Sequence, residues 1–337
     1  MTIFITGAAG YIGGMLAHRF LGEKQVKRVV CLDIKPAPPH FPVSNPKVAW
    51  VIHDLGEAGW EEKVLKWGAP DVVIHCAYLI RVAYSSKHRE RQIKSNIGGA
   101  EKVFQFALNH GVKKLIHFST AASYGAYPTN TTKKRFKEDD PFRDSQYLYA
   151  QDKKIIEEKI EELFKALKPK TQVFVIRPAA VTGPRGQFMY NRFGLLQMVK
   201  QGLPIVPITH PDSARQFIHE DDIFEAISLM TFGNFPEKYH VFNLAPQDFL
   251  LLTEVARTIK KPIIRIPKIL GKFAFATLWH LSRGKIPTAP AGIDSYSYPI
   301  ILDGSKITKF GFQYSYNSLE SLRADRGYYA RFVEHSK

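Results

Sequence analysis

The chain has 337 residues, of which 45% are hydrophobic and 23% are charged, a composition typical of soluble globular domains. The formal net charge of +16 comes from lysines and arginines spread along the whole length. They do not form the compact basic stripe, interleaved with aromatic residues, that a nucleic-acid-binding module presents. No apolar run is long enough to span a membrane. Cys31 and Cys76 lie in apolar runs, so we expect reduced thiols in a cytoplasmic protein, with no disulfide and no metal.

Short runs rich in valine and isoleucine alternate with helix-like segments in the first half of the chain. The expected strands are Thr2–Thr6, Val26–Asp33, Val48–His53, Val72–Ala77, Lys114–Ser119 and Val173–Ile176. The expected helices are Tyr11–Leu21, a long helix through Asn96 to His110, and Tyr147–Ala166. This alternation predicts an α/β fold: a Rossmann-type doubly wound parallel sheet with helices on both faces.

The pattern becomes irregular after Pro178. Residues 1–178 are expected to form a nucleotide-binding domain, to which residues 212–245 return because Gln216–Ile218 and His240–Asn243 are short, strand-like runs. Residues 179–211 and 246–337 would then build a smaller, mixed substrate-binding lobe. Its expected place is over the carboxyl edge of the sheet, where open α/β folds bind their ligands.

Three glycines, Gly7, Gly10 and Gly13, follow the first strand and open the first helix. The first permits a tight turn, the second lets the backbone approach a pyrophosphate, and the third lets helix and strand pack closely. Asp33 ends the second strand, where a carboxylate accepts hydrogen bonds from ribose hydroxyls and repels the 2′-phosphate of NADP. The pattern predicts NAD as the cofactor, although the nearby cation of Lys35 could soften the discrimination.

Together with other motifs in the same order, this segment resembles the extended short-chain dehydrogenase/reductase superfamily, in its NAD-dependent epimerase/dehydratase group. The motifs that carry the resemblance are Thr6 to Gly13, His53-Asp54-Leu55, His75-Cys76-Ala77, Asn96, Phe118 to Gly125, Tyr149 to Lys153, Val175 to Pro178 and Arg215 to Asp222. The resemblance implies that NAD contacts Gly7, Ala9, Gly10, Tyr11, Ile12, Gly13, Asp33, Asp54, Leu55, Cys76, Ala77, Tyr78, Asn96, Ser119, Tyr149, Lys153 and Pro178.

Tyr149 and Lys153 form the predicted catalytic pair. Residues four apart share one face of a helix, and a nearby ammonium favours the phenolate of a tyrosine. Tyr149 could therefore exchange a proton with a substrate hydroxyl while the nicotinamide exchanges a hydride. The resemblance adds Thr120, whose hydroxyl would orient the reacting oxygen. The alternative for Ser119 and Thr120 is ordinary turn chemistry at the end of a strand.

The residues after Thr120 narrow the reaction. The dehydratases that this family resembles carry an Asp-Glu pair there, and related decarboxylases keep a glutamate, but this chain has Ala121 and Ala122. Alanine cannot transfer protons, so dehydration and decarboxylation are disfavoured. Reversible hydride transfer at one carbinol remains, either as net oxidation or reduction or within an epimerisation, with a nucleotide-sugar 4-epimerase-like or sugar dehydrogenase reaction preferred.

The residues expected to contact substrate are Thr120, Ala180 and Arg215. Arg215 matches the arginine that binds diphosphate in nucleotide-sugar epimerases, and guanidinium suits a bidentate phosphate contact. An equal alternative is a structural ion pair with the acidic cluster Glu220 to Asp222. Ala180 stands where those epimerases usually carry an asparagine, and a second expected arginine is missing before Asp303.

An apolar segment from Ile269 to Leu281, flanked by Lys268, Arg283 and Lys285, has three interpretations. It could pack on its own lobe, line a hydrophobic pocket for a sterol- or isoprenoid-like alcohol, or lie shallowly in a membrane interface. Two functions without catalysis are also open: an NAD-binding regulatory protein, and a basic membrane-surface protein. The family resemblance suggests a homodimer through the helices that contain Asn96 to His110 and Tyr147–Ala166.

Overall fold

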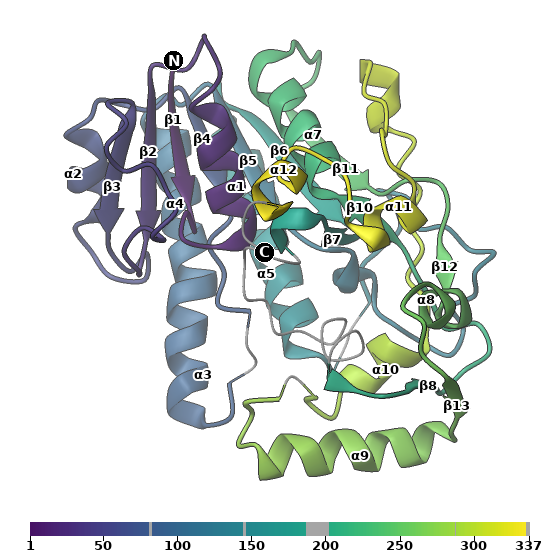
Figure 1. Ribbon diagram of the computed structural model, residues 1–337. Coiled ribbons are helices and arrows are strands. Elements are labelled where there is room, and N and C mark those ends of the chain that lie inside the picture. The colour runs from purple at the N-terminus through teal and green to yellow at the C-terminus, as the bar shows by residue number, and fades with distance from the viewer. Residues whose placement is uncertain (81–82, 144–145, 187–201, 287, 335–337) are drawn as a thin grey trace.

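The computed structural model describes residues 1–80, 83–143, 146–186, 202–286 and 288–334. A seven-stranded sheet with the order β11-β6-β5-β4-β1-β2-β3 forms its centre (Figure 1). Every neighbouring pair is parallel, which confirms the predicted doubly wound sheet. The strands are β1 (Thr2–Thr6), β2 (Arg28–Asp33), β3 (Val48–Ile52), β4 (Val72–His75), β5 (Lys114–Phe118), β6 (Gln172–Pro178) and β11 (Tyr239–Leu244).

The strand order reverses direction between β1 and β4. From β1 the chain builds outward through β2 and β3, and it then returns to β1 and builds the other way through β4, β5 and β6. Loops leaving β1 and β4 therefore part from each other at the carboxyl edge of the sheet, which leaves a crevice between them. The glycine-rich turn after Thr6 and the loop after His75 lie at this point.

Helices cover both faces of the sheet (Figure 1). Alternate residues of one strand point to opposite faces, so Ile74 joins the core beneath α1 and α7 while Val73 joins the core beneath α4 and α5. The helices of this half of the fold are α1 (Tyr11–Phe20), α2 (Trp60–Leu65), α3 (Ser86–Ile93), α4 (Gly99–Asn109), α5 (Leu148–Leu167) and α7 (Glu220–Phe232). The long helix expected through Asn96 is α4, which a π-helical turn at Lys94–Gly98 joins to α3.

The two segments expected to return to the sheet behave differently. β11 takes the edge beside β6 along the whole of that strand, as predicted for His240–Asn243. The segment expected at Gln216–Ile218 forms β10 (Phe217–His219), which pairs with β7 (Ala180–Thr182) in a separate two-stranded sheet. Ile218 is buried in the same core as helix α1, so the segment returns to the large domain as expected, although it does not join the seven-stranded sheet.

A smaller lobe follows with its own apolar core, which includes Val206, Phe275, Ile293 and Tyr296. Two short strand pairs, β8 with β13 and β9 with β12, support three helices there. The elements are β8 (Val206–Ile208), β9 (Ala214–Arg215), β12 (Leu250–Leu251), α8 (Leu252–Thr258), β13 (Ile263–Arg265), α9 (Lys268–Leu281) and α10 (Gly292–Ser297). Part of the expected lobe, residues 187–201, lies outside the described residues.

The end of the chain leaves this lobe and packs on the large domain. Leu302, Ile307 and Tyr329 are buried in the same core as helix α1, and Leu302 exchanges two backbone hydrogen bonds with the Gln216 side chain. The elements of this part are α11 (Ser318–Arg323) and α12 (Ala330–Glu334). The C-terminal part of the range 246–337, expected in the small lobe, therefore belongs to the core of the large domain.

Candidate active site

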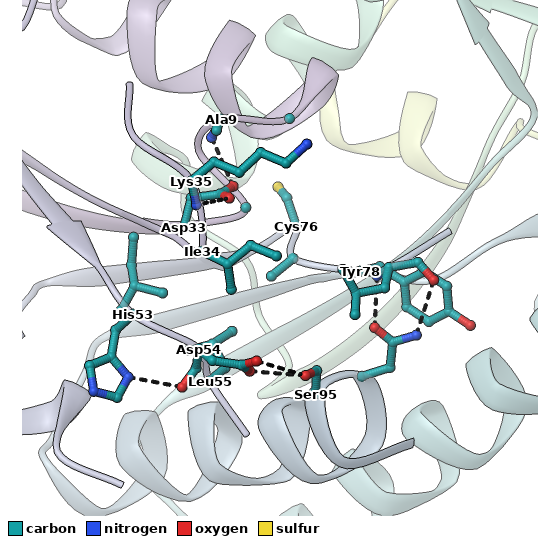
Figure 2. A pocket seen from close by; sticks show the side chains of 16 residues that line it. Ala9, Asp33, Ile34, Lys35, His53, Asp54, Leu55, Cys76, Tyr78 and Ser95 are labelled. Carbon is teal, nitrogen blue, oxygen red and sulfur yellow. Dashed lines mark hydrogen bonds between the residues drawn. The ribbon is translucent and has the colours of Figure 1, made fainter. Parts of the chain in front are cut away.

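A groove lies at the reversal of strand order, where the crevice is expected. It encloses about 730 Å³ of space, part of it open to solvent. Figure 2 shows Asp33 and Lys35 on one wall, Asp54 and Ser95 on another, and Tyr78 at one end. The residues that line it are Gly7, Ala9, Gly10, Leu32, Asp33, Ile34, Lys35, His53, Asp54, Leu55, Cys76, Ala77, Tyr78, Leu79, Ser95 and Asn96. Ten of the residues expected to contact NAD are among them.

The glycine-rich turn fits a dinucleotide closely. Gly7 has a φ of +71°, and a Cβ there would come within 2.7 Å of the Ala77 backbone. A Cβ on Gly13 would come within 2.3 Å of the Gly7 carbonyl oxygen, because helix α1 lies directly against the turn. Gly10 provides no side-chain cap for α1, and such helix N-termini bind phosphates. This cradle is the shape and chemistry that NAD requires.

Asp33 connects the end of β2 to the glycine-rich turn. Its carboxylate accepts hydrogen bonds from the Ala9 amide (2.9 Å) and the Lys35 amide (3.0 Å). Burial raises the pKa of Asp33, and these backbone donors act in the opposite direction. The acid therefore faces the groove from a fixed position, and Ile34 and Lys35 form the adjacent rim.

The opposite wall is held by a second acid and an amide. Asp54 accepts from the Ser95 hydroxyl at 2.9 Å and from the Gly56 amide at 2.9 Å. Asn96 accepts from the Leu79 amide at 2.7 Å through its side-chain oxygen. These contacts tie the π-helical turn before α4 to the loop after β4. Ser95 had no signal of its own in the sequence, because only this contact across the chain places it in the groove.

Lys153 and Tyr149 lie on α5 beyond the end of the groove. The buried ammonium of Lys153 donates a 2.6 Å hydrogen bond to the Phe118 carbonyl at the end of β5. It also lies 4.4 Å from the centre of the Tyr78 ring. Tyr149, one turn earlier, packs edge-on against the same ring at 5.3 Å. Tyr78 therefore contacts both members of the predicted catalytic pair.

Burial lowers the pKa of Lys153 to about 8, although Cys76, Glu157 and Asp152 oppose the effect. Two histidines on neighbouring strands, His75 and His117, stack at 5.4 Å under the same site. Burial, followed by the charge of Lys153, lowers the pKa of His75 to about 3. The same causes lower the pKa of His117, so Lys153 is bordered by two neutral imidazoles.

An ion pair that the sequence analysis did not identify fixes Tyr78. The Tyr78 hydroxyl donates to Asp152 at 3.1 Å, and the guanidinium of Arg89 donates to both Asp152 oxygens at 2.5 and 2.6 Å. Asp152 is buried on α5 next to Lys153, whereas Arg89 comes from α3. The contact joins segments 63 residues apart, which no local pattern could indicate.

Thr120 and Ser119 follow β5 at the same edge of the sheet. The Thr120 hydroxyl oxygen accepts a 3.2 Å hydrogen bond from the Ala122 amide and caps the short helix Ala121–Tyr124. The turn chemistry weighed as the alternative is therefore present. It uses an acceptor position of the hydroxyl and leaves its proton for a substrate oxygen.

Other expected contact residues lie at the margin or outside the groove. The Tyr11 side chain turns away and donates to Glu220, and Ile12 packs against the core. Pro178 ends β6, and Ala180 is exposed on β7. If Tyr11 contacts NAD, it therefore does so through its backbone at the start of α1.

Arg215 is held by backbone carbonyls in the small lobe. Its guanidinium donates to Ala214 at 2.6 Å, to Ser295 at 2.6 Å and to Tyr296 at 2.8 Å. The alternative of an ion pair with the acidic cluster was wrong. Those acids have other partners: Glu220 accepts from Tyr11, Asp221 from Arg19, and Asp222 from the backbone of Ser315 and Tyr316.

Comparison with known proteins agrees with this geometry. The family model described as "NAD dependent epimerase/dehydratase family" matches residues 3–245. The chain belongs to this family. It is 25% identical over 326 residues to Protein CapI of Staphylococcus aureus, covering 87% of this chain and 91% of that protein. It is 27% identical over 238 residues to a probable UDP-glucuronate 4-epimerase of Rhizobium meliloti, covering 67% of each.

The fold is also similar to that of a solved relative. A UDP-glucose 4-epimerase from Thermotoga maritima, crystallised with UDP-glucose, superposes with a TM-score of 0.73 at 20% identity, covering 100% of this chain and 99% of that one. The protein is thus an NAD-dependent enzyme of the extended short-chain dehydrogenase/reductase type, with an epimerase-like fold.

Proposed function

We propose that the protein is a nucleotide-sugar 4-epimerase that uses Thr120, Tyr149 and Lys153. The observation that carries the proposal is the position of Lys153, buried where the NAD groove ends and one helical turn from Tyr149. The relatives named as UDP-sugar 4-epimerases support a nucleoside diphosphate sugar as the substrate class.

Each residue has a separate task in this scheme. NAD, when bound in the groove, supplies the acceptor for a hydride from the substrate carbon. Tyr149 takes the proton of the substrate hydroxyl, and the positive charge of Lys153 favours the phenolate that this requires. The hydroxyl proton of Thr120 is donated to the same substrate oxygen and orients it. Return of the proton from Tyr149 would accompany return of the hydride to the opposite face of the same carbon, so the configuration would be inverted with no net oxidation.

The turn after Thr120 favours epimerisation over elimination. Ala121 and Ala122 form the helical turn between Thr120 and Ser123, and neither can carry a proton. The diphosphate is assigned to Arg215. Three of the five guanidinium N–H groups are committed to carbonyls, so the remaining two would make the contact.

The alternative substrate, a sterol- or isoprenoid-like alcohol, would need the apolar residues of α9 to line a pocket. Phe275 and Trp279 are buried in the packing of the lobe, and the other large apolar residues of α9 are exposed. The described residues of α9 therefore give no support to a hydrophobic pocket in this lobe.

The test is conversion of UDP-glucose and UDP-glucuronate to their 4-epimers, followed by chromatography of the products. Tyr149→Phe should lower kcat by about 10²–10⁴-fold, the usual contribution of a positioned acid-base group, and leave the dissociation constant for NAD nearly unchanged. Tyr147→Phe, on the neighbouring aromatic residue, should keep full activity. Turnover that is unaffected by Tyr149→Phe would remove this residue from the mechanism.

We also propose a cytoplasmic homodimer, the oligomeric state that the family resemblance suggests. The free thiols of Cys31 and Cys76 suit a reducing compartment. Helices α4 and α5 lie side by side, joined by a 2.8 Å ion pair between Lys159 and Glu101, and two such pairs would form a four-helix contact. Light scattering on the purified protein measures the mass directly.

A further inference from the structure

Helix α9 presents an apolar face to solvent. Its large exposed side chains are the following, with the exposed fraction of each: Ile269 57%, Leu270 55%, Phe273 65%, Leu278 36% and Leu281 81%. At 3.6 residues per turn, these five positions fall within about one half of the helix circumference. Ile263 and Ile264 of the adjoining strand β13 are each 43% exposed. A helix on the surface of a soluble domain normally turns a polar face outward, so this face needs an explanation.

The opposite face of α9 already has its partners. Gly271, Phe275 and Trp279, four residues apart, are the buried residues of the helix, and Phe275 packs against Tyr296 of the lobe. The helix is therefore fixed in place without its outer face. In Figure 1, α9 lies along the outer edge of the molecule, on the far side of the small lobe from the central sheet.

The surroundings of this face are strongly basic. Residues 260–285 contain seven lysines and arginines and no aspartate or glutamate. Lys268 is paired with Asp294 at 2.5 Å and Lys261 donates to the Leu203 carbonyl. The remaining five are exposed, and they flank the apolar residues at both ends and along the side of α9: Lys260, Arg265, Lys272, Arg283 and Lys285.

We propose that the outer face of α9 and β13 binds the surface of an anionic lipid bilayer. Apolar side chains would enter the boundary between headgroups and acyl chains, while the basic residues around them contact lipid phosphates. The exposed face is a projecting helix and not a groove, which suits a flat lipid surface. A second copy of the chain is disfavoured, because it would bring two clusters of positive charge together. None of the helices in the described part of the chain could cross a membrane, so the association is peripheral.

Helix α9 contacts the chain segment that follows the NAD groove. Tyr84, in the loop that leaves the groove after Leu79, contacts both Trp279 at 5.9 Å and His280 at 6.1 Å. Trp279 belongs to the buried face of α9, so this contact links the helix to the segment that follows the groove. The inference rests on the surface of α9 and does not require the proposed epimerase reaction.

The test is co-sedimentation of the full-length protein with lipid vesicles. The wild type should bind vesicles of equal parts phosphatidylcholine and phosphatidylglycerol, bind pure phosphatidylcholine weakly, and lose affinity as salt is raised. Phe273→Glu combined with Leu281→Glu should weaken binding about tenfold or more. Leu167→Glu, at a 48% exposed leucine on α5, is the matched control and should bind as the wild type does.

Three results would overturn the proposal. They are no binding of the wild type to the anionic vesicles, equal binding by the Phe273→Glu/Leu281→Glu variant, and a stable dimer in solution that this variant dissociates, which would make the face a contact between copies. NAD affinity measured on the same variants separates the two proposals. It should stay at the wild-type value whether or not the membrane proposal fails, and its loss would point to damage to the fold.

Discussion

Replacing Lys153 by methionine should make the protein more stable at neutral pH while removing its activity. The side chain is 5% exposed, and burial moves its pKa from 10.5 to about 8. At about 1.4 kcal/mol per pH unit, holding the charged form costs about 3 kcal/mol of unfolding free energy. Methionine removes this cost and also removes the hydrogen bond to the Phe118 carbonyl and the contact with the Tyr78 ring, together worth about 1–2 kcal/mol. The net gain at pH 7 is about 1–2 kcal/mol.

The pH dependence distinguishes this explanation from simple repacking. Between pH 8 and 10.5 the unfolded wild type keeps a proton on Lys153 that the folded protein has released. The wild type therefore gains stability as pH rises through this window, because the unfolded state binds more protons. Lys153→Met lacks that gain, so its advantage should fall by about 2 kcal/mol by about pH 9.5 and change sign.

Urea unfolding followed by circular dichroism at pH 7, 8, 9 and 9.5 measures the difference between wild type and variant. All other titrating groups are common to both proteins and cancel in this difference. Lys165→Met, at a lysine 71% exposed on the same helix, should change stability by less than about 0.5 kcal/mol at every pH. A Lys153→Met difference that stays constant, or grows, as pH rises would refute the reasoning.

Two further substitutions test the packing of the site. Gly13→Ala places a Cβ within 2.3 Å of the Gly7 carbonyl oxygen and should weaken NAD binding about tenfold or more by displacing the turn; fluorescence titration measures it. Glu157→Gln leaves the guanidinium of Arg177, 8% exposed, without its carboxylate. It should cost about 3–5 kcal/mol of unfolding free energy, measured by urea unfolding.

Each of these changes has a matched control in the chain. At Gly98→Ala, no atom of the described residues outside the surrounding helix lies within 4 Å of the new Cβ, so NAD affinity should stay unchanged. Glu158→Gln removes a carboxylate that is 49% exposed and should cost less than about 0.5 kcal/mol. Equal effects of a test substitution and its control would contradict the packing argument for that position.

The parallel sheet and the NAD turn could be predicted because their signals are local. A buried parallel strand needs a continuous apolar run, and the turn at Gly7 needs a glycine at positive φ, so both leave their mark in a few consecutive residues. The same holds for the spacing of Tyr149 and Lys153. The resemblance extended these signals to Asp54, whose groove position depends on neighbours far along the chain.

Contacts between distant segments could not be predicted in the same way. Nothing near Arg89 in the sequence indicates that it meets Asp152 or that the pair fixes Tyr78. The three backbone acceptors of Arg215 depend on how α10 approaches β9. The sequence suggested a diphosphate contact or an ion pair with the acidic cluster, and neither interpretation included these carbonyls. The partner of Phe217–His219, strand β7, could not be predicted either, because strand-like residues do not specify which strand they pair with.

The C-terminal segment returns to the large domain. The unit that folds together therefore extends beyond the residues that the family model matches. The family match ends at residue 245, yet Ile301 and Asp303 both pair with the backbone of Phe136, and Tyr329 is buried against α1. The small lobe is thus an insertion between two segments of the chain that share the core of the large domain, and both of its ends are fixed to that core. A truncation at residue 245, where the family model ends, would expose that core to solvent, so we expect a chain cut there to be less stable than the full-length protein.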